Sequence, residues 1–142
     1  VSNPALLSIK KWRGLTNNDQ NRCYVNSVLQ MVYTSPEFTN LVQSKPGSDI
    51  DLLVALDQLY ESLRSSSPSP TSARFVQTQV NSGDSQLMKP EQQNAHQFFL
   101  KLINKLKEIF HVAGQSNPVD DLFQWETTTT TKCMGPGCPY ER

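Results

Sequence analysis

Apolar residues recur at helical spacing directly after Cys23. They share one face of a helix: Val25, Val28, Leu29, Val32 and Tyr33. The stripe predicts a helix that begins at Cys23 and ends around Thr34 and Ser35, because Pro36 disfavours helical backbone in the residue before it. A cysteine therefore lies at the start of an amphipathic helix.

Two further stripes predict two longer helices. Leucines at three- and four-residue spacing predict a helix over residues 49–64, with Ser48 or Asp49 as its N-cap. The other stripe predicts a helix over residues 90–111, and Pro90 suits the first helical turn. Both patterns are typical of helices that bury one face against a core.

The remaining segments are more polar. Residues 65–72 read SSSPSPTS and are expected to form a surface loop, whereas residues 73–80 fit either a short helix or an extended piece. Residues 127–131 are threonines with high β propensity and no helical stripe, so they predict a strand. The expected fold class is mainly α with a short β region at the C-terminus.

Composition narrows the function classes. The chain has 142 residues, 37% of them hydrophobic, which is enough for an ordinary globular domain. Its 13 basic and 13 acidic residues give no net charge, so we expect no nucleic-acid partner. No apolar run approaches the roughly 18 residues of a membrane helix, so no membrane partner is expected. Three cysteines do not make a disulfide framework, which favours a reducing compartment, the cytoplasm or the nucleus.

The position of Cys23 suits a thiol nucleophile. The preceding loop, residues 14–22, is rich in asparagine and can supply amide donors. The following helix points the positive end of its dipole at the sulfur, which favours the thiolate over the thiol. A buried structural cysteine is the alternative that this position alone leaves open.

Residues 14–30, GLTNNDQNRCYVNSVLQ, resemble the cysteine box of the ubiquitin-specific proteases, G-L-x-N-x-G-N-T-C-Y-x-N-S-x-L-Q. The resemblance implies that Cys23 is the catalytic nucleophile and that an asparagine stabilises the oxyanion. Counting back from Cys23 gives Asn18, and counting forward from Gly14 gives Asn17. We favour Asn18, because the chemistry fixes its distance from the nucleophile. The glycine of the pattern is Gln20 here, which predicts an altered loop backbone.

Residues 92–98, QQNAHQF, resemble a second box of this family, Q-Q-D-A-x-E-F. The resemblance implies that Gln93, Asn94 and Gln97 bind the substrate, because this segment lies near the groove for the ubiquitin tail. Two carboxylates that contact tail arginines in the family are the amides of Asn94 and Gln97 here. An amide forms no charged pair, so we expect weaker ubiquitin binding or a preference for another ubiquitin-like modifier.

Cys133 and Cys138 resemble half of the zinc knuckle that many family members carry at their β fingers. Their spacing is C-x4-C, and structural zinc needs four ligands. The pair therefore fits half of a structural site whose other half lies elsewhere, and a small zinc-ribbon protein is a further alternative. Catalysis itself is expected to need no cofactor. The resemblance divides the chain into a helical thumb lobe, residues 1–121, and the start of the fingers, residues 122–142.

A cysteine protease also needs a base, and the chain holds only His96 and His111. Neither matches the His box that family members carry further downstream. The chain therefore resembles the N-terminal half of a papain-like catalytic domain that is α+β as a whole. The expected function is thiol-dependent deubiquitination with ubiquitin, or a ubiquitin-like protein, and a ubiquitinated substrate as partners, although the fragment alone is expected to be inactive. A non-catalytic modifier-binding or scaffold module is the alternative. A palm segment or a partner is expected to cover the apolar face that such a half-domain exposes.

Overall fold

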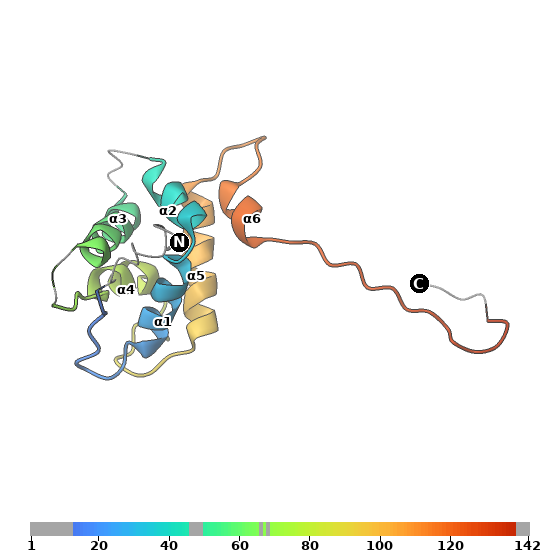
Figure 1. The fold of residues 1–142 in the computed structure, drawn as a ribbon, viewed down its shortest axis with the longest axis horizontal. Helices are drawn as coiled ribbons and strands as arrows, with labels where there is room; N and C mark the ends of the chain where they lie inside the picture. Colours follow the sequence, from blue (N-terminus) through green and yellow to red (C-terminus); the bar gives the residue numbers. More distant parts are fainter. Residues whose placement is uncertain (1–12, 46–49, 66, 68, 139–142) are drawn as a thin grey trace, which may run out of the picture.

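The computed structural model describes residues 13–45, 50–65, 67 and 69–138. These residues form helices joined by loops (Figure 1). The helices are α1 (Cys23–Val32), α2 (Pro36–Gln43), α3 (Asp51–Arg64), α4 (Arg74–Asn81), α5 (Ala95–Ile109) and α6 (Pro118–Phe123). Almost none of the described residues is in a strand, so the expected mainly α class is confirmed.

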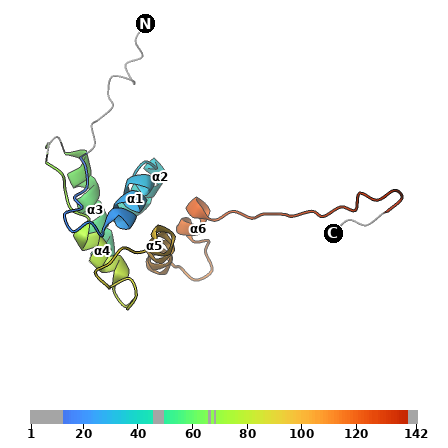
Figure 2. The ribbon, with the colours of Figure 1, turned by 90° about the horizontal axis from the view of Figure 1, so that it is seen from below.

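The helices bury their apolar stripes in one core. Helix α1 packs on α5, α3 packs on both α2 and α4, and α6 closes the group against α2 and α5 (Figures 1 and 2). Leu29, Leu56 and Phe98, from three different helices, are completely buried. The Tyr33 hydroxyl donates a hydrogen bond of 2.6 Å to the Leu56 carbonyl and so ties the end of α1 to α3.

Helix α2 was not predicted. The chain leaves α1 at Val32, two residues before the expected end, and starts a new helix at Pro36. Proline suits the first helical turn, and the Ser35 hydroxyl accepts a hydrogen bond of 3.3 Å from the Phe38 N–H. Pro36 therefore ends one helix and begins the next.

Other helix starts also differ from the expectation. Helix α5 begins at Ala95 with Asn94 as its N-cap, so the predicted start at Pro90 is wrong. Helix α3 begins at Asp51 with Ile50 in the N-cap position. The predicted caps of α3, residues 48 and 49, lie outside the described residues. For residues 73–80 the sequence fits either a short helix or an extended piece. These residues lie almost wholly in helix α4.

The loop after α3 is paired with the segment that precedes α1. Leu15 and Thr71 form an isolated parallel bridge, with hydrogen bonds of 2.8 Å from the Thr16 N–H to the Thr71 carbonyl and 2.9 Å from the Thr71 N–H to the Gly14 carbonyl. This pairing fixes where the chain enters the cysteine loop.

The C-terminal tail leaves the helical body beside α6 (Figures 1 and 2). The predicted strand over residues 127–131 is not formed. A strand needs a hydrogen-bonded neighbour, and the described residues supply none for this segment. The expected domain boundary at residue 121 falls inside α6, which continues to Phe123. Within the described ranges, no helix is long and apolar enough to cross a membrane.

Candidate functional site

Cys23 is an exposed free thiol at the first position of α1. Arg22 occupies the N-cap position, and no side chain caps the helix. The first backbone N–H groups of a helix have no partner inside it, so they remain available to a ligand here. A negative oxygen beside Cys23 would therefore meet both these donors and the positive end of the helix dipole.

The second sequence box meets the first at the sulfur. The Gln92 side chain donates from Nε2 to the Cys23 Sγ over 2.7 Å, although 69 residues separate the two. Packing of α1 on α5 brings these two segments together. Gln92 was not among the predicted substrate-binding residues, which were Gln93, Asn94 and Gln97 of the same box. Its position inside the recognised QQNAHQF segment was the signal that could have identified it.

The two asparagines of the cysteine loop have different surroundings. Asn17 accepts with Oδ1 from the Arg22 N–H at 2.8 Å, and its carbonyl accepts from the Gln20 N–H at 3.0 Å. Asn18 is exposed, and its side chain forms no hydrogen bond with any other described residue. The Nδ2 groups of both asparagines have no partner among the described residues, and the two residues differ in that the Asn17 oxygen is bound to the loop whereas the Asn18 side chain is not.

Gln20 has a φ of +58°, in the left-handed region that favours glycine. The sequence expectation was that replacing glycine would change the loop backbone. Instead, the glutamine itself adopts a backbone conformation typical of glycine. The loop therefore carries local strain three residues before Cys23.

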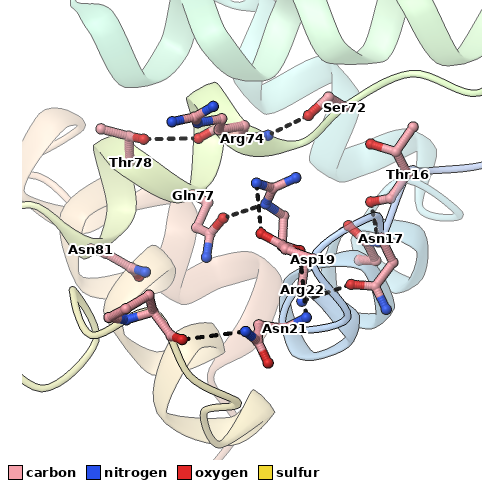
Figure 3. Close-up of polar contacts among 12 residues, drawn as sticks. Thr16, Asn17, Asp19, Asn21, Arg22, Ser72, Arg74, Gln77, Thr78 and Asn81 are labelled. Carbon is pink, nitrogen blue, oxygen red and sulfur yellow. Dashed lines mark hydrogen bonds and ion pairs between the residues drawn. The ribbon is translucent and has the colours of Figure 1, made fainter.

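Polar contacts hold the cysteine loop onto the helical body. In Figure 3, Arg22 lies between Asp19 and Gln77. The Asn21 amide donates to the Pro90 carbonyl at 3.2 Å. The Asn26 amide donates to the Thr16 carbonyl at 3.1 Å. Asn26 therefore acts as a loop-binding residue and not as an acid or base.

The predicted substrate-binding residues occupy three different environments. Asn94 caps α5: its Oδ1 accepts from the His96 N–H at 2.8 Å and from the Gln97 N–H at 3.3 Å. Gln97 is exposed and lines a cavity of about 280 Å³ together with Leu100. Gln93 is only 9% exposed, and its Nε2 has no hydrogen-bond partner. Asn94 and Gln97 can therefore face a ligand, whereas Gln93 lies beneath the surface.

Both histidines of the chain belong to α5 or its end. His96 lies in the first turn of the helix, and the exposed His111 follows its last residues. Neither imidazole forms a hydrogen bond with Cys23, whose described side-chain partner is Gln92. Among the described residues, Cys23 thus lies beside the Gln92 amide, and no histidine is hydrogen-bonded to it.

Cys133 and Cys138 lie together in a turn of the tail, closed by a 3.1 Å hydrogen bond from the Cys138 N–H to the Gly135 carbonyl. Hydrogen bonds from the Cys138 side chain and from the Gly135 backbone lower the pKa of the Cys133 thiol below its usual value. Two adjacent thiols suit a soft metal such as zinc. No group of three or more metal-binding side chains occurs in the described ranges, so Cys133 and Cys138 have no further metal-binding side chain grouped with them there.

An exposed thiol at a helix N-terminus, with an amide donor beside it, is one part of the arrangement that a cysteine hydrolase uses. The family model described as ubiquitin carboxyl-terminal hydrolase matches residues 13–138. The chain belongs to this family, which confirms the resemblance inferred from the two boxes and makes the protein a deubiquitinase-type hydrolase by family. No curated protein gives a significant match.

Proposed function

We propose that Cys23 is the nucleophile that hydrolyses the isopeptide bond at the C-terminal glycine of ubiquitin or a ubiquitin-like modifier. The observation that supports this most directly is the exposed Cys23 thiol, with Gln92 Nε2 at 2.7 Å and an uncapped helix N-terminus beside it.

The reaction would follow the usual order of acyl transfer to a thiol. The Cys23 sulfur adds to the glycine carbonyl carbon, and the carbonyl π electrons move to the oxygen. When the carbonyl re-forms, the C–N bond breaks and the lysine amine leaves with a proton, and water then hydrolyses the thioester. In this proposal Asn18 and the first N–H groups of α1 stabilise the negative oxygen. Loss of one such donor typically costs about 3 kcal/mol of transition-state stabilisation.

The base that takes the thiol proton is proposed to come from residues other than His96 and His111. In this proposal the chain forms the helical thumb lobe, residues 1–121, and the start of the β fingers, residues 122–142, of a larger α+β catalytic domain. A palm segment or a partner protein would then cover the exposed apolar side chains, and the chain alone would be inactive.

The binding site for the modifier tail is proposed to differ from a site lined by carboxylates, because Asn94 and Gln97 are neutral amides. Because the Asn94 oxygen already accepts two backbone N–H groups, the amide presents its Nδ2 donor to a ligand. Gln97 is likewise neutral. Arginine has only donors, so an arginine-bearing tail would lose a charge-assisted hydrogen bond at each position.

This specificity can be tested with the double variant Asn94→Asp/Gln97→Glu. Carboxylates at both positions should tighten ubiquitin binding by about tenfold or more, since a hydrogen bond to a charged group contributes about 1.5–3 kcal/mol. Titration of both proteins with ubiquitin, and with ubiquitin whose tail arginines are alanine, measures the effect. An equal gain for both ligands would contradict the proposal.

Cys133 and Cys138 are proposed to supply two of the four ligands of a structural zinc ion, while catalysis itself needs no cofactor. Metal analysis of the full-length protein and of its Cys133→Ser variant tests this. The proposed partners are the modifier and the ubiquitinated protein, and the proposed location is the cytoplasm or the nucleus.

A non-catalytic module that binds the modifier is the second candidate. It is favoured by the neutral Asn94 and Gln97 and by the lack, among the described residues, of a histidine hydrogen-bonded to Cys23. A ubiquitin probe with a C-terminal electrophile separates the two functions in the full-length protein. Labelling that Cys23→Ala abolishes supports the hydrolase, whereas binding of the probe without a covalent product supports the module.

A further inference from the structure

Arg22 links the cysteine loop to the helical body in a way that the family pattern does not anticipate. The pattern has threonine immediately before the nucleophile, whereas this chain has arginine. The Arg22 side chain is largely buried, with only 14% of its surface exposed. A buried guanidinium requires several hydrogen-bond acceptors, and the structure supplies them.

The contacts of Arg22 lie on both sides of Asn18. Its backbone N–H donates to Asn17 Oδ1 at 2.8 Å, and its guanidinium forms an ion pair with Asp19 at 2.9 Å. The Arg22 Nε donates to Gln77 Oε1 of α4 at 3.0 Å (Figure 3). One residue therefore binds the neighbours of the proposed oxyanion donor and ties them to a helix.

The same contacts continue into the core. The Gln77 Nε2 donates to the Tyr24 hydroxyl at 3.0 Å, and the Asn81 amide donates to the same oxygen at 3.3 Å. Tyr24 is only 2% exposed, and its ring packs edge-on against Phe98 of α5 at a centroid distance of 5.6 Å. The loop contacts thus end on side chains that cannot move independently of α1, α4 and α5.

The strained turn explains why such an anchor is needed. Gln20, with its φ of +58°, lies between Asp19 and Arg22. An unfavourable backbone conformation persists only where the surrounding contacts enforce it. The planar guanidinium can hold Asp19 and Gln77 at once, which the short hydroxyl of a threonine cannot.

We propose that Arg22 is a positioning residue for the reaction at Cys23. It holds the turn around Asn18 in place, so that the Asn18 amide meets the substrate oxygen when that oxygen becomes negative. Arg22 itself touches neither the substrate nor the sulfur. The inference rests on the function proposed for Cys23, whereas the anchoring of the loop can be tested without it.

The test uses the full-length protein, the variants Arg22→Ala and Arg22→Lys, and the control Arg64→Ala. Arg64 forms a more exposed ion pair, with Glu61 at 3.3 Å on α3. The first probe is ubiquitin with a C-terminal aldehyde: the sulfur bonds to the carbonyl carbon, the C=O π electrons move to the oxygen to give an oxyanion, and the thiol proton goes to solvent. The second is chloroacetamide: the sulfur displaces chloride and the proton goes to solvent, with no oxyanion. Peptide mass spectrometry follows Cys23, and amide hydrogen exchange follows residues 17–22.

We expect Arg22→Ala to weaken aldehyde binding by roughly tenfold or more, because a displaced oxyanion donor loses most of its effect. Alkylation of Cys23 should stay within about twofold, because that reaction does not use the oxyanion donors. Exchange at residues 17–22 should accelerate, Arg22→Lys should be intermediate, and Arg64→Ala should match the wild type.

Unchanged exchange and unchanged aldehyde affinity in Arg22→Ala would overturn the inference. Equal losses in both reactions together with faster exchange throughout the helices would also overturn it, because Arg22 would then act only on global stability. If the wild type binds no aldehyde, the proposed hydrolase function fails. Faster exchange confined to residues 17–22 in Arg22→Ala would still establish the anchor, and unchanged exchange would refute it.

Discussion

At the residue scale, Gln20 has the most unusual backbone geometry near the site. It is the one non-glycine residue with a positive φ, +58°, in the part of the chain that the structure describes. A left-handed conformation costs an ordinary residue about 1–2 kcal/mol, and glycine avoids that cost at the expense of a more flexible unfolded chain. We therefore expect Gln20→Gly to stabilise the protein by about 0.5–1 kcal/mol, as measured by urea unfolding.

Gly83 provides a control of opposite sign for that measurement. Its φ is +82°, and a Cβ added there would meet no atom within 4 Å, so the backbone alone determines the effect. Gly83→Ala should destabilise the protein by about 1 kcal/mol. Equal effects of the two substitutions would contradict the strain assigned to Gln20.

The buried hydroxyl of Tyr33 should make the protein less stable at alkaline pH. Burial, together with the charge of Asp57 and the neighbouring Tyr60, raises the pKa of Tyr33 above its ordinary value of 10.0. Below pH 10 both the folded and unfolded states keep the proton. Above it only the unfolded chain releases the proton, so the free energy of unfolding falls by up to about 1.4 kcal/mol per pH unit.

Urea unfolding of the wild type and Tyr33→Phe at pH 8 and pH 11 measures this contribution. At pH 8 the variant should be less stable by about 1 kcal/mol, because it lacks the hydrogen bond to the Leu56 carbonyl. At pH 11 the difference should shrink or reverse, since phenylalanine has no proton to lose. A difference that stays constant with pH would show that Tyr33 does not cause the alkaline loss.

At the element scale, Asn94 controls the start of α5. Its side chain accepts two backbone N–H groups, so Asn94→Ala should cost about 1 kcal/mol of the free energy of unfolding. Asn94→Asp is the matched variant: it keeps the cap and adds a negative charge at the positive end of the helix dipole, which should gain about 0.3–1 kcal/mol. Thermal unfolding of both variants tests the order. An alanine variant as stable as the aspartate variant would refute it.

The elements also show how far the sequence determines the fold. The long apolar stripes predicted α1, α3 and α5, because the residues that these helices bury recur at helical spacing along the sequence. The eight-residue α2 was missed because its proline was interpreted only as the end of α1. The strand over residues 127–131 failed for another reason, since β propensity has no effect without a pairing partner.

The candidate site was predictable where its chemistry is local. The start of the apolar stripe placed Cys23 at a helix N-terminus, and the structure agrees. The contacts of Cys23 with Gln92, and of Arg22 with Gln77, depend on how α1, α4 and α5 pack. No local pattern encodes contacts between residues so distant in the sequence.

At the scale of the whole molecule, the helical body and the tail differ in kind. The last residues that pack on the core belong to α6: Val119 is fully buried, and the Phe123 ring lies 5.6 Å from Phe99 and 6.2 Å from Phe38, centroid to centroid. Two residues later, Trp125 is 81% exposed. Stability of the body should therefore depend on α6 and not on the tail residues beyond it.

Two truncations of the 142-residue chain test this division. A chain that ends at Trp125 should keep its helical circular dichroism and its unfolding midpoint in urea, because none of the removed residues that the structure describes, 126–138, belongs to the core. A chain that ends at Asn117 loses the buried side chains of α6 and should be destabilised by more than about 3 kcal/mol, since each large apolar side chain buried contributes about 1.5–3 kcal/mol. A large loss of stability already in the chain that ends at Trp125 would mean that the tail packs on the body, and that the helices are not a separately stable unit.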